Sequence, residues 1–219
     1  MAPLHILLLL VLLAVLIGFV ELGMLTAAFD KLGLSAHSAY LLLITTLAGS
    51  FINVPLFLIR SEPHPGVSIP PQFREFLRLP RIAPEPGRTV IAVNVGGAVV
   101  PVSFCAYLIH HNPLSAVYLS TCIAAVTLVA WLFSRPIRGL GIGIPILIAP
   151  ITAAAIAYLV DRDQAAPLAY IGGTLGVLIG ADLLRLRDIR RMGVPFASIG
   201  GAGSFDGVFL TGLLAVLLS

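Results

Sequence analysis

The chain has 219 residues, of which 58% are hydrophobic and only 11% are charged. An ordinary globular protein carries about 25% charged residues, and a water-soluble fold of this length could not cover its surface with so few. The composition therefore excludes secreted, cytosolic and disordered proteins. It predicts a multi-pass membrane protein, with the lipid bilayer as its partner.

Seven apolar stretches are candidates to cross about 30 Å of hydrocarbon as helices. We therefore expect an all-α membrane protein of about seven transmembrane helices, folded as a single domain over residues 1–219. The last stretch is interrupted by glycines, so we expect it to be partly re-entrant. In chain order the predicted spans are Leu4–Phe19, Ala39–Ile59, Thr89–Ile109, Leu114–Phe133, Leu140–Val160, Leu168–Leu184 and Val194–Leu218.

The basic residues divide unevenly between the two ends of these spans. Of the 13 Lys and Arg residues, all but Lys31 and Arg162 follow the second, fourth or sixth span. Cytoplasmic loops of membrane proteins are enriched in Lys and Arg, so we expect the N-terminus in the cytoplasm and the C-terminus outside. Because topology accounts for the arginines, no nucleic-acid partner is expected.

The only sizeable loop is the proline-rich segment 60–88, which this topology places in the cytoplasm. Its prolines predict extended or irregular backbone. Within it, the segment Gln72–Leu79 has Phe73, Phe76 and Leu77 at helical spacing. This pattern predicts a short helix on the membrane surface, and an ordinary solvated loop is the alternative.

Two carboxylates remain inside the predicted spans. Ionisable groups at membrane depth are costly and are functional candidates by default. Asp182 lies near the cytoplasmic end of the sixth span, and Asp206 lies in 200–207, a segment with four glycines. Both carboxylates therefore fall on the same side of the membrane. Because helices joined by a short loop are neighbours, we also expect the two carboxylates on neighbouring helices. The structural alternatives are an Asp182–arginine pair and an N-cap role for Asp206.

A third polar group, Asn94, enters the third span at a similar depth. Glycines beside these polar groups admit another backbone, water or a substrate. A different set, Gly172, Gly176 and Gly180, recurs every four residues and predicts close helix packing. No metal-binding or cofactor-binding motif is present, and none is expected to be bound. The predicted substrate-binding or ion-binding residues are Asn94, Gly96, Gly97, Gly200, Gly201, Gly203, Ser204 and Gly207.

The last two spans resemble the presenilin and signal-peptide-peptidase group of intramembrane aspartyl proteases. In that group one Asp lies on a helix running from the outside to the cytoplasm, and a second lies in a Gly-x-Gly-Asp motif that opens the next helix. Asp182 and the segment Gly203-Ser204-Phe205-Asp206 are similar to this arrangement, although Phe205 replaces the second glycine. The resemblance implies that Asp182 and Asp206 are catalytic and that the substrate is a transmembrane peptide.

A second resemblance covers most of the chain. The segments Asn94–Ala98, Tyr170–Leu184 and Ser198–Gly212 are similar to a family of prokaryotic integral-membrane proteins known only as a domain of unknown function. This resemblance implies one domain in a prokaryotic cell membrane and brings no activity with it.

Three functions therefore stay open, and with them whether the protein is an enzyme. Two carboxylates that share a proton activate water, which suits an intramembrane hydrolase. Broken helices with ionisable groups also bind ions in transporters and channels, so the same carboxylates suit a small ion or proton. The third hypothesis is a non-catalytic membrane scaffold in which the Asp residues pair with Arg185 or Arg187.

Overall fold

The computed structural model describes residues 11, 14, 15, 18, 23–62, 87–137, 141–201 and 207–219, and a few side chains within α2 and α10 are not described. The described part of the chain is mostly helical and also contains five strands. Most of the predicted first span, and all of Gln72–Leu79, lie outside the described residues.

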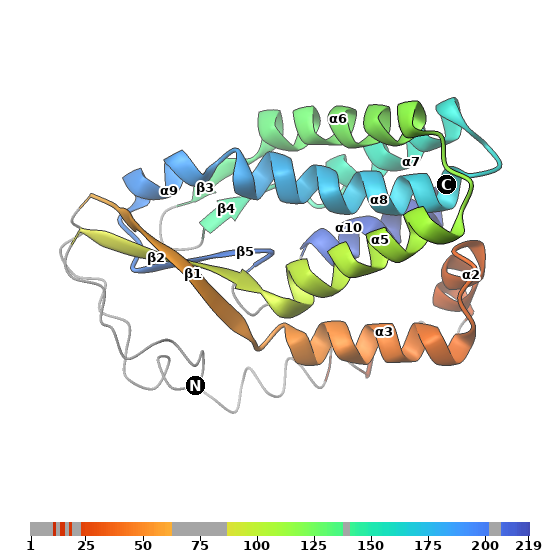
Figure 1. Ribbon diagram of the computed structural model, residues 1–219, viewed down its shortest axis with the longest axis horizontal. Coiled ribbons are helices and arrows are strands. Elements are labelled where there is room, and N and C mark those ends of the chain that lie inside the picture. Colours follow the sequence, from red (N-terminus) through yellow and green to blue (C-terminus); the bar gives the residue numbers. More distant parts are fainter. Residues whose placement is uncertain are drawn as a thin grey trace.

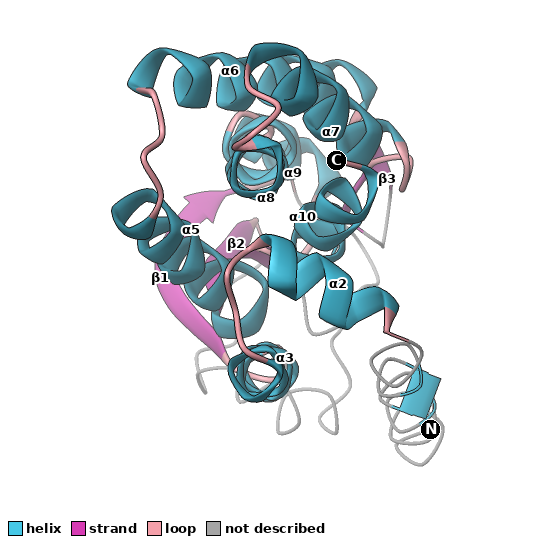
Figure 2. Ribbon diagram, turned by 90° about the vertical axis from the view of Figure 1, so that its right-hand side faces the viewer, coloured by secondary structure: helices cyan, strands magenta, loops and turns pink. Residues whose placement is uncertain are grey.

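The helices form a bundle around α8 (Ala165–Val177). Seen end-on, α8 lies in the middle of the bundle (Figure 2). Four helices pack against it: α5 (Val100–His111), α6 (Ala116–Phe133), α7 (Ile148–Val160) and α10 (Gly207–Leu218). The helix that carries Asp182 in its continuation is therefore the central element of the fold.

Two helices are long and apolar enough to cross a membrane. One is α6, and the other is α8 together with the π-helical segment η2 (Leu178–Leu183) that continues it. The helix α6 exposes large apolar side chains such as Leu128 and Leu132, whereas most of α8 is buried. Helical structure in the predicted fourth and sixth spans is thereby confirmed.

Three shorter helices complete the described helical part. They are α2 (Met24–Lys31), α3 (Ala36–Gly49) and α9 (Leu186–Met192). Ser35 caps the start of α3, because its Oγ accepts a hydrogen bond from the Ser38 amide at 3.2 Å. The helix α9 lies at the end of the molecule where the sheet is found (Figure 1).

A three-stranded sheet adjoins one end of the bundle. Its strands are β1 (Asn53–Arg60), β2 (Arg88–Asn94) and β5 (Phe196–Ile199), in the order β1-β2-β5. The first two are antiparallel, with Asn53 opposite Asn94, and β5 runs parallel to β2. The chain thus leaves the sheet after β2, forms most of the bundle, and returns beside the same strand. Figure 1 shows β1 and β2 reaching past the end of α6.

These strands correct the predicted all-α fold. The second span was expected to be helical over Ala39–Ile59, but α3 ends at Gly49 and β1 follows. Hydropathy alone does not distinguish an apolar strand from an apolar helix. Pro55 cannot donate to a helix interior and is tolerated in an edge strand, and β2 is rich in β-branched residues that favour strands.

The third and fifth spans also begin with strands. The expected helix from Thr89 starts only at Val95, after β2. In the predicted fifth span, β4 (Gly141–Gly143) pairs with β3 (Arg135–Ile137), and α7 begins only at Ile148. Three glycines and a proline between residues 139 and 145 explain the delay, because both residue types oppose a helix interior.

The glycine interruption of the seventh span is confirmed. The span begins as β5 and then turns at Gly200 and Gly201, which have positive φ of 79° and 90°. It is helical from Gly207. A left-handed backbone of this kind favours glycine because it has no Cβ. The depth of this segment relative to a bilayer stays a prediction.

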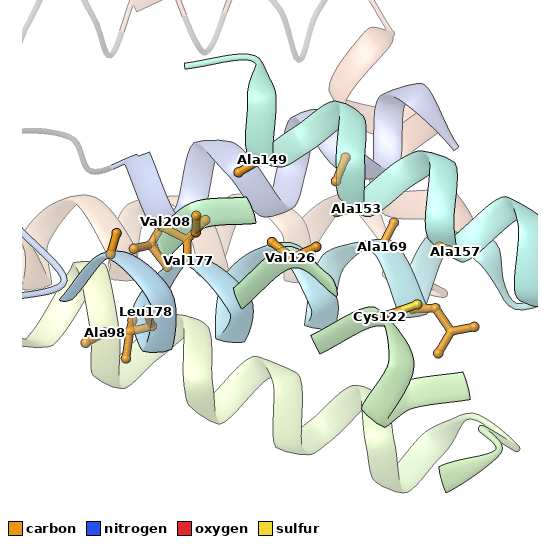
Figure 3. Close-up of a cluster of buried hydrophobic side chains, with 14 of the residues drawn as sticks. Ala98, Cys122, Val126, Ala149, Ala153, Ala157, Ala169, Val177, Leu178 and Val208 are labelled. Carbon is orange, nitrogen blue, oxygen red and sulfur yellow. The ribbon is translucent and has the colours of Figure 1, made fainter. Parts of the chain in front are cut away.

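Close packing of the repeated glycines on α8 is also confirmed. A Cβ placed on Gly172 or Gly176 would lie 3.0 Å from Cys122 Cβ or 2.6 Å from Val126 Cβ, both on α6. These two α6 residues lie in the buried apolar cluster shown in Figure 3. Small residues let the two helices approach closely, and both cysteines of the chain, Cys105 and Cys122, are buried packing residues.

Candidate functional site

The candidate site lies where the bundle meets the sheet. Three chain segments converge there: the junction of β2 with the π-helical segment η1 (Val95–Val99), the end of β5, and η2. The residues Asn94, Gly96, Gly97, Gly200 and Asp182, predicted from the sequence to lie at a similar depth, come from these segments. Single π-helical turns are frequent at functional sites.

Asn94 is the polar centre of the junction and is 1% exposed. Its Oδ1 accepts the Gly97 amide at 2.7 Å and so begins η1. Its Nδ2 donates to the Ser50 carbonyl oxygen at 2.7 Å and to Asn53 Oδ1 at 3.2 Å. One buried amide therefore joins the end of α3, the start of β1 and η1, and its polar atoms are satisfied as buried polar groups require.

Asn53 extends this network to β5. The Ser198 hydroxyl donates to Asn53 Oδ1 at 2.7 Å, so that oxygen accepts two hydrogen bonds. The amide nitrogen of Asn53 is buried and has no hydrogen-bond partner within the described part of the chain. Asn53 is 7% exposed, and an unpaired donor at such a position is uncommon in folded proteins.

The glycines at the junction bring backbones into direct contact. A Cβ on Gly96 would overlap the Thr46 carbonyl oxygen of α3, and one on Gly200 would lie 2.7 Å from the Gly97 carbonyl carbon. Side chains at either position would separate the segments. The expectation that these glycines admit another backbone is confirmed for Gly96 and Gly200.

Asp182 lies in η2, is partly exposed, and faces β5. Its Oδ2 accepts the Gly200 amide at 2.7 Å. Gly180, two residues earlier, faces Thr127 and Ala130 of α6 instead. The glycine repeat and the carboxylate therefore contact different neighbours.

The structural alternative for Asp182, pairing with Arg185, is not what the described contacts show. Arg185 forms a salt bridge of 3.0 Å with Asp188. Its guanidinium also donates to the carbonyl oxygens of Trp131 and Ser134 at the end of α6. These acceptors engage the Arg185 guanidinium. The Gly200 amide bonds to Oδ2 of Asp182, which leaves Oδ1 for other contacts.

The second predicted carboxylate, Asp206, lies outside the described residues, as do Gly203 and Ser204. Gly207 is the first residue of α10. Its neighbour Val208 is 2% exposed and belongs to the same buried cluster as Ala181 (Figure 3 labels Val208). Since α10 packs along α8 and contacts η1, the chain that follows Asp206 enters the core beside the helix that bears Asp182.

Sequence reasoning did not single out three residues of this network: Ser50, Asn53 and Ser198. Asn53 fell inside a predicted span, and its signal was available, since an Asn beside Pro55 in an apolar run opposes a continuous helix. Ser198 had no distinguishing pattern of its own. Backbone pairing across the sheet brings the three together, and a linear sequence does not display it.

A second group of buried polar atoms lies in the other half of the bundle. The hydroxyls of Tyr170 and Thr174 are fully buried and lie close to each other and to the Cys105 thiol. Gly212 of α10 closes over them, because a Cβ there would lie 2.6 Å from Thr174 Oγ1. Within the described residues no three His, Cys, Asp or Glu side chains lie together in a way that would hold a metal ion.

Comparison with known proteins gives one match. A family described as "Protein of unknown function (DUF1614)" matches residues 47–218. The chain belongs to this family. The DUF1614 match begins in α3 and ends in α10, so it includes Asn53, Asn94, Asp182 and Ser198 of the junction. No curated protein and no solved structure matches the chain, so the resemblance to presenilin-type proteases depends on the motif residues alone.

Proposed function

We propose that this DUF1614 protein is an intramembrane hydrolase in which Asp182 and Asp206 act as a carboxylate pair. The observation that carries the proposal is the position of Asp182: a carboxylate on the central helix of an apolar bundle, bonded through one oxygen to the Gly200 amide. An ionisable side chain so placed is a functional candidate by default. The chain after Gly200 reaches α10 within a few residues, with Asp206 directly before it.

The chemistry requires only water and the two carboxyl groups. Two neighbouring carboxyls share one proton, because both cannot be charged at close range. The ionised member takes a proton from water as its oxygen attacks the peptide carbonyl carbon, and the protonated member gives its proton to the carbonyl oxygen. Collapse of the tetrahedral intermediate then breaks the C–N bond and delivers a proton to the leaving amine.

The arginines support a placement across the cytoplasmic membrane. At the sheet end of the protein, Arg60 lies opposite Arg88 in β1 and β2, and α9 carries three more arginines. At the far end Lys31 closes α2, and Arg162 follows α7. Basic residues favour the cytoplasmic side, so the proposal puts the sheet, α9 and the junction toward the cytoplasm. Open strand edges avoid lipid, and β1 and β2 extend past α6 (Figure 1).

Cysteine labelling in cells tests this placement. Arg162 and Arg190 are both exposed and lie at opposite ends of the protein. A membrane-impermeant maleimide should modify Arg162→Cys in intact cells, and Arg190→Cys only after the membrane is opened. The native cysteines give no background, because both are buried. The reverse pattern would overturn the orientation, and equal labelling of both in intact cells would exclude a membrane between them.

Cleavage of a single-span reporter peptide tests the hydrolase. Asp182→Asn and Asp206→Asn should each lower the rate by about 100-fold or more, the range for loss of a general acid or base. Asp163→Asn is the matched control, since Asp163 is exposed in the turn before α8. If purified protein cleaves the reporter and the double variant Asp182→Asn/Asp206→Asn cleaves it equally well, the carboxylate pair is refuted.

One observation favours a second candidate, ion or proton transport. The buried hydroxyls of Tyr170 and Thr174 lie on α8, the helix that continues into the turn carrying Asp182. Polar groups in both halves of one buried helix suit a conduction path. Proton or sodium flux into proteoliposomes that Asp182→Asn abolishes, with no peptide cleavage by the wild type, would favour transport over hydrolysis.

A further inference from the structure

The amide nitrogen of Asn53 and the hydroxyl of Thr46 are the two buried polar atoms of the junction that have no hydrogen-bond partner among the described residues. Of the two, the Asn53 amide nitrogen carries two N–H donors and lies on the side of β5. The orientation of this side-chain amide is chemically fixed, because Asn94 Nδ2 and the Ser198 hydroxyl both converge on Asn53 Oδ1. Asn94 is itself oriented by the Gly97 amide and the Ser50 carbonyl, so exchanging the O and N atoms of Asn53 would set two donors against each other.

Asn53 and Asp182 approach the same short piece of backbone. Ser198 bonds to Asn53, and Gly200, two residues along the same chain, bonds to Asp182. Ser198, Gly201 and Asp182 are all partly exposed. The end of β5 is therefore flanked by an amide donor without an acceptor and a carboxylate with one oxygen not engaged by Gly200.

The chemistry of this pair selects the ligand. A neutral amide donor fits a neutral carbonyl oxygen, and the negative charge of Asp182 disfavours anions beside it. The surrounding junction is apolar, with Ile91, Ile199 and Ala98 buried in its core. A peptide segment with apolar side chains supplies backbone carbonyls in such surroundings. We propose that Asn53 Nδ2 binds a backbone carbonyl oxygen of an apolar peptide held beside Asp182.

This inference rests on the proposed hydrolase and names its substrate class and a residue that binds it. A buried donor without an acceptor destabilises the folded protein. A carbonyl oxygen that accepts from Asn53 should therefore stabilise the folded protein. Asn53 then discriminates peptides from ligands without a carbonyl, because a site built to hydrogen-bond a group rejects analogues that lack it.

Binding is measured with a fluorescent single-span apolar peptide and the Asp182→Asn protein, in which cleavage is blocked. Adding Asn53→Asp keeps the oxygen that accepts from Asn94 and Ser198 but removes the N–H donors. It should raise the Kd for the peptide at least tenfold. Asn112→Asp is the control for the chemical change, because Asn112 caps the far end of α5 through the Leu108 carbonyl. An unchanged Kd with Asn53→Asp overturns the inference.

A second measurement does not depend on the variant folding. Peptides carrying a 13C-labelled backbone carbonyl at successive positions are bound to the Asp182→Asn protein and observed by infrared spectroscopy. One labelled carbonyl should shift to lower frequency on binding, as a new hydrogen bond requires. If no position shifts, or if no peptide binds, the inference is refuted.

The two proposals fail separately. A wild-type protein that binds peptide through Asn53 without cleaving it leaves the inference standing and removes the hydrolase. A wild-type protein that cleaves peptide and is unaffected by Asn53→Asp in both Kd and cleavage rate retains the hydrolase and removes the role of Asn53. Asp163→Asn should behave as wild type in every assay, because its side chain is exposed in the turn before α8.

Discussion

Replacing Gly96 by alanine tests whether backbone contact at the junction organises the site. In an unhindered helix, Gly→Ala stabilises by up to about 1 kcal/mol. At Gly96 the new Cβ would overlap the Thr46 carbonyl oxygen and lie 2.6 Å from Ser50 Oγ. Overpacking of this kind costs about 3 kcal/mol, and a shift of η1 would strain the Asn94 bond to Ser50, worth about 1 kcal/mol. The expected net effect is a destabilisation of about 3 kcal/mol.

Gly173→Ala is the matched control, because Gly173 is also half of a Gly-Gly pair in a helix. Its added Cβ would meet Thr211, Ala153 and Gly212 at 3.4–3.6 Å, which is ordinary contact. This variant should be as stable as the wild type or up to about 1 kcal/mol more stable. Equilibrium unfolding of both variants in detergent gives the comparison. If Gly96→Ala proves as stable as Gly173→Ala, the contact between η1 and α3 does not hold the junction together.

The remaining predictions concern the network, the arginine end and the cysteines. Asn94→Ala should destabilise by about 2–3 kcal/mol in the same unfolding assay, because it removes bonds to Ser50, Asn53 and Gly97; an effect below about 0.5 kcal/mol would contradict the role given to Asn94. Arg185→Gln should cost about 2 kcal/mol through lost charge-assisted bonds, whereas Arg162→Gln, which loses a contact with the Tyr158 ring, should cost less than about 1 kcal/mol. Cys105 and Cys122 should resist maleimide in folded protein and react fully after denaturation, followed by mass spectrometry; rapid labelling of either in the folded state would contradict their burial.

The helical core and part of the site were predictable from the sequence for physical reasons. The glycines spaced four apart on α8 could only face one neighbour, and they pack against α6. Asn94 and Asp182 were predicted to lie at a similar depth, because ionisable and polar side chains stand out in apolar spans, and Gly96 and Gly200 were predicted to admit another backbone, water or a substrate beside them. The structure brings these four together.

The sheet was not predictable in the same way. Hydropathy measures how apolar a segment is, and β1 is as apolar as a helical span would be, with Leu56, Phe57 and Leu58 all exposed. What makes it a strand is its pairing with β2, a partner 28 or more residues away in the sequence. The role of Asn53 was not predictable for the same reason. Its side chain accepts hydrogen bonds from Asn94 and Ser198, and pairing in the sheet places these residues beside it.

The distribution of satisfied and unsatisfied polar atoms supports the proposed site. At the junction nearly every polar group is used to hold backbone: Asn94 binds Gly97 and Ser50, and the Ser50 hydroxyl returns to the Thr46 carbonyl. A purely structural network would leave no donor over, because each unpaired buried group destabilises the fold. Among the described residues, Thr46 Oγ1 and Asn53 Nδ2 are left over nonetheless, and Asn53 Nδ2 lies near a carboxylate that the Gly200 amide engages through one oxygen. A rigid frame with an unpaired amide donor near a carboxylate is the arrangement expected of a site that binds and positions a ligand.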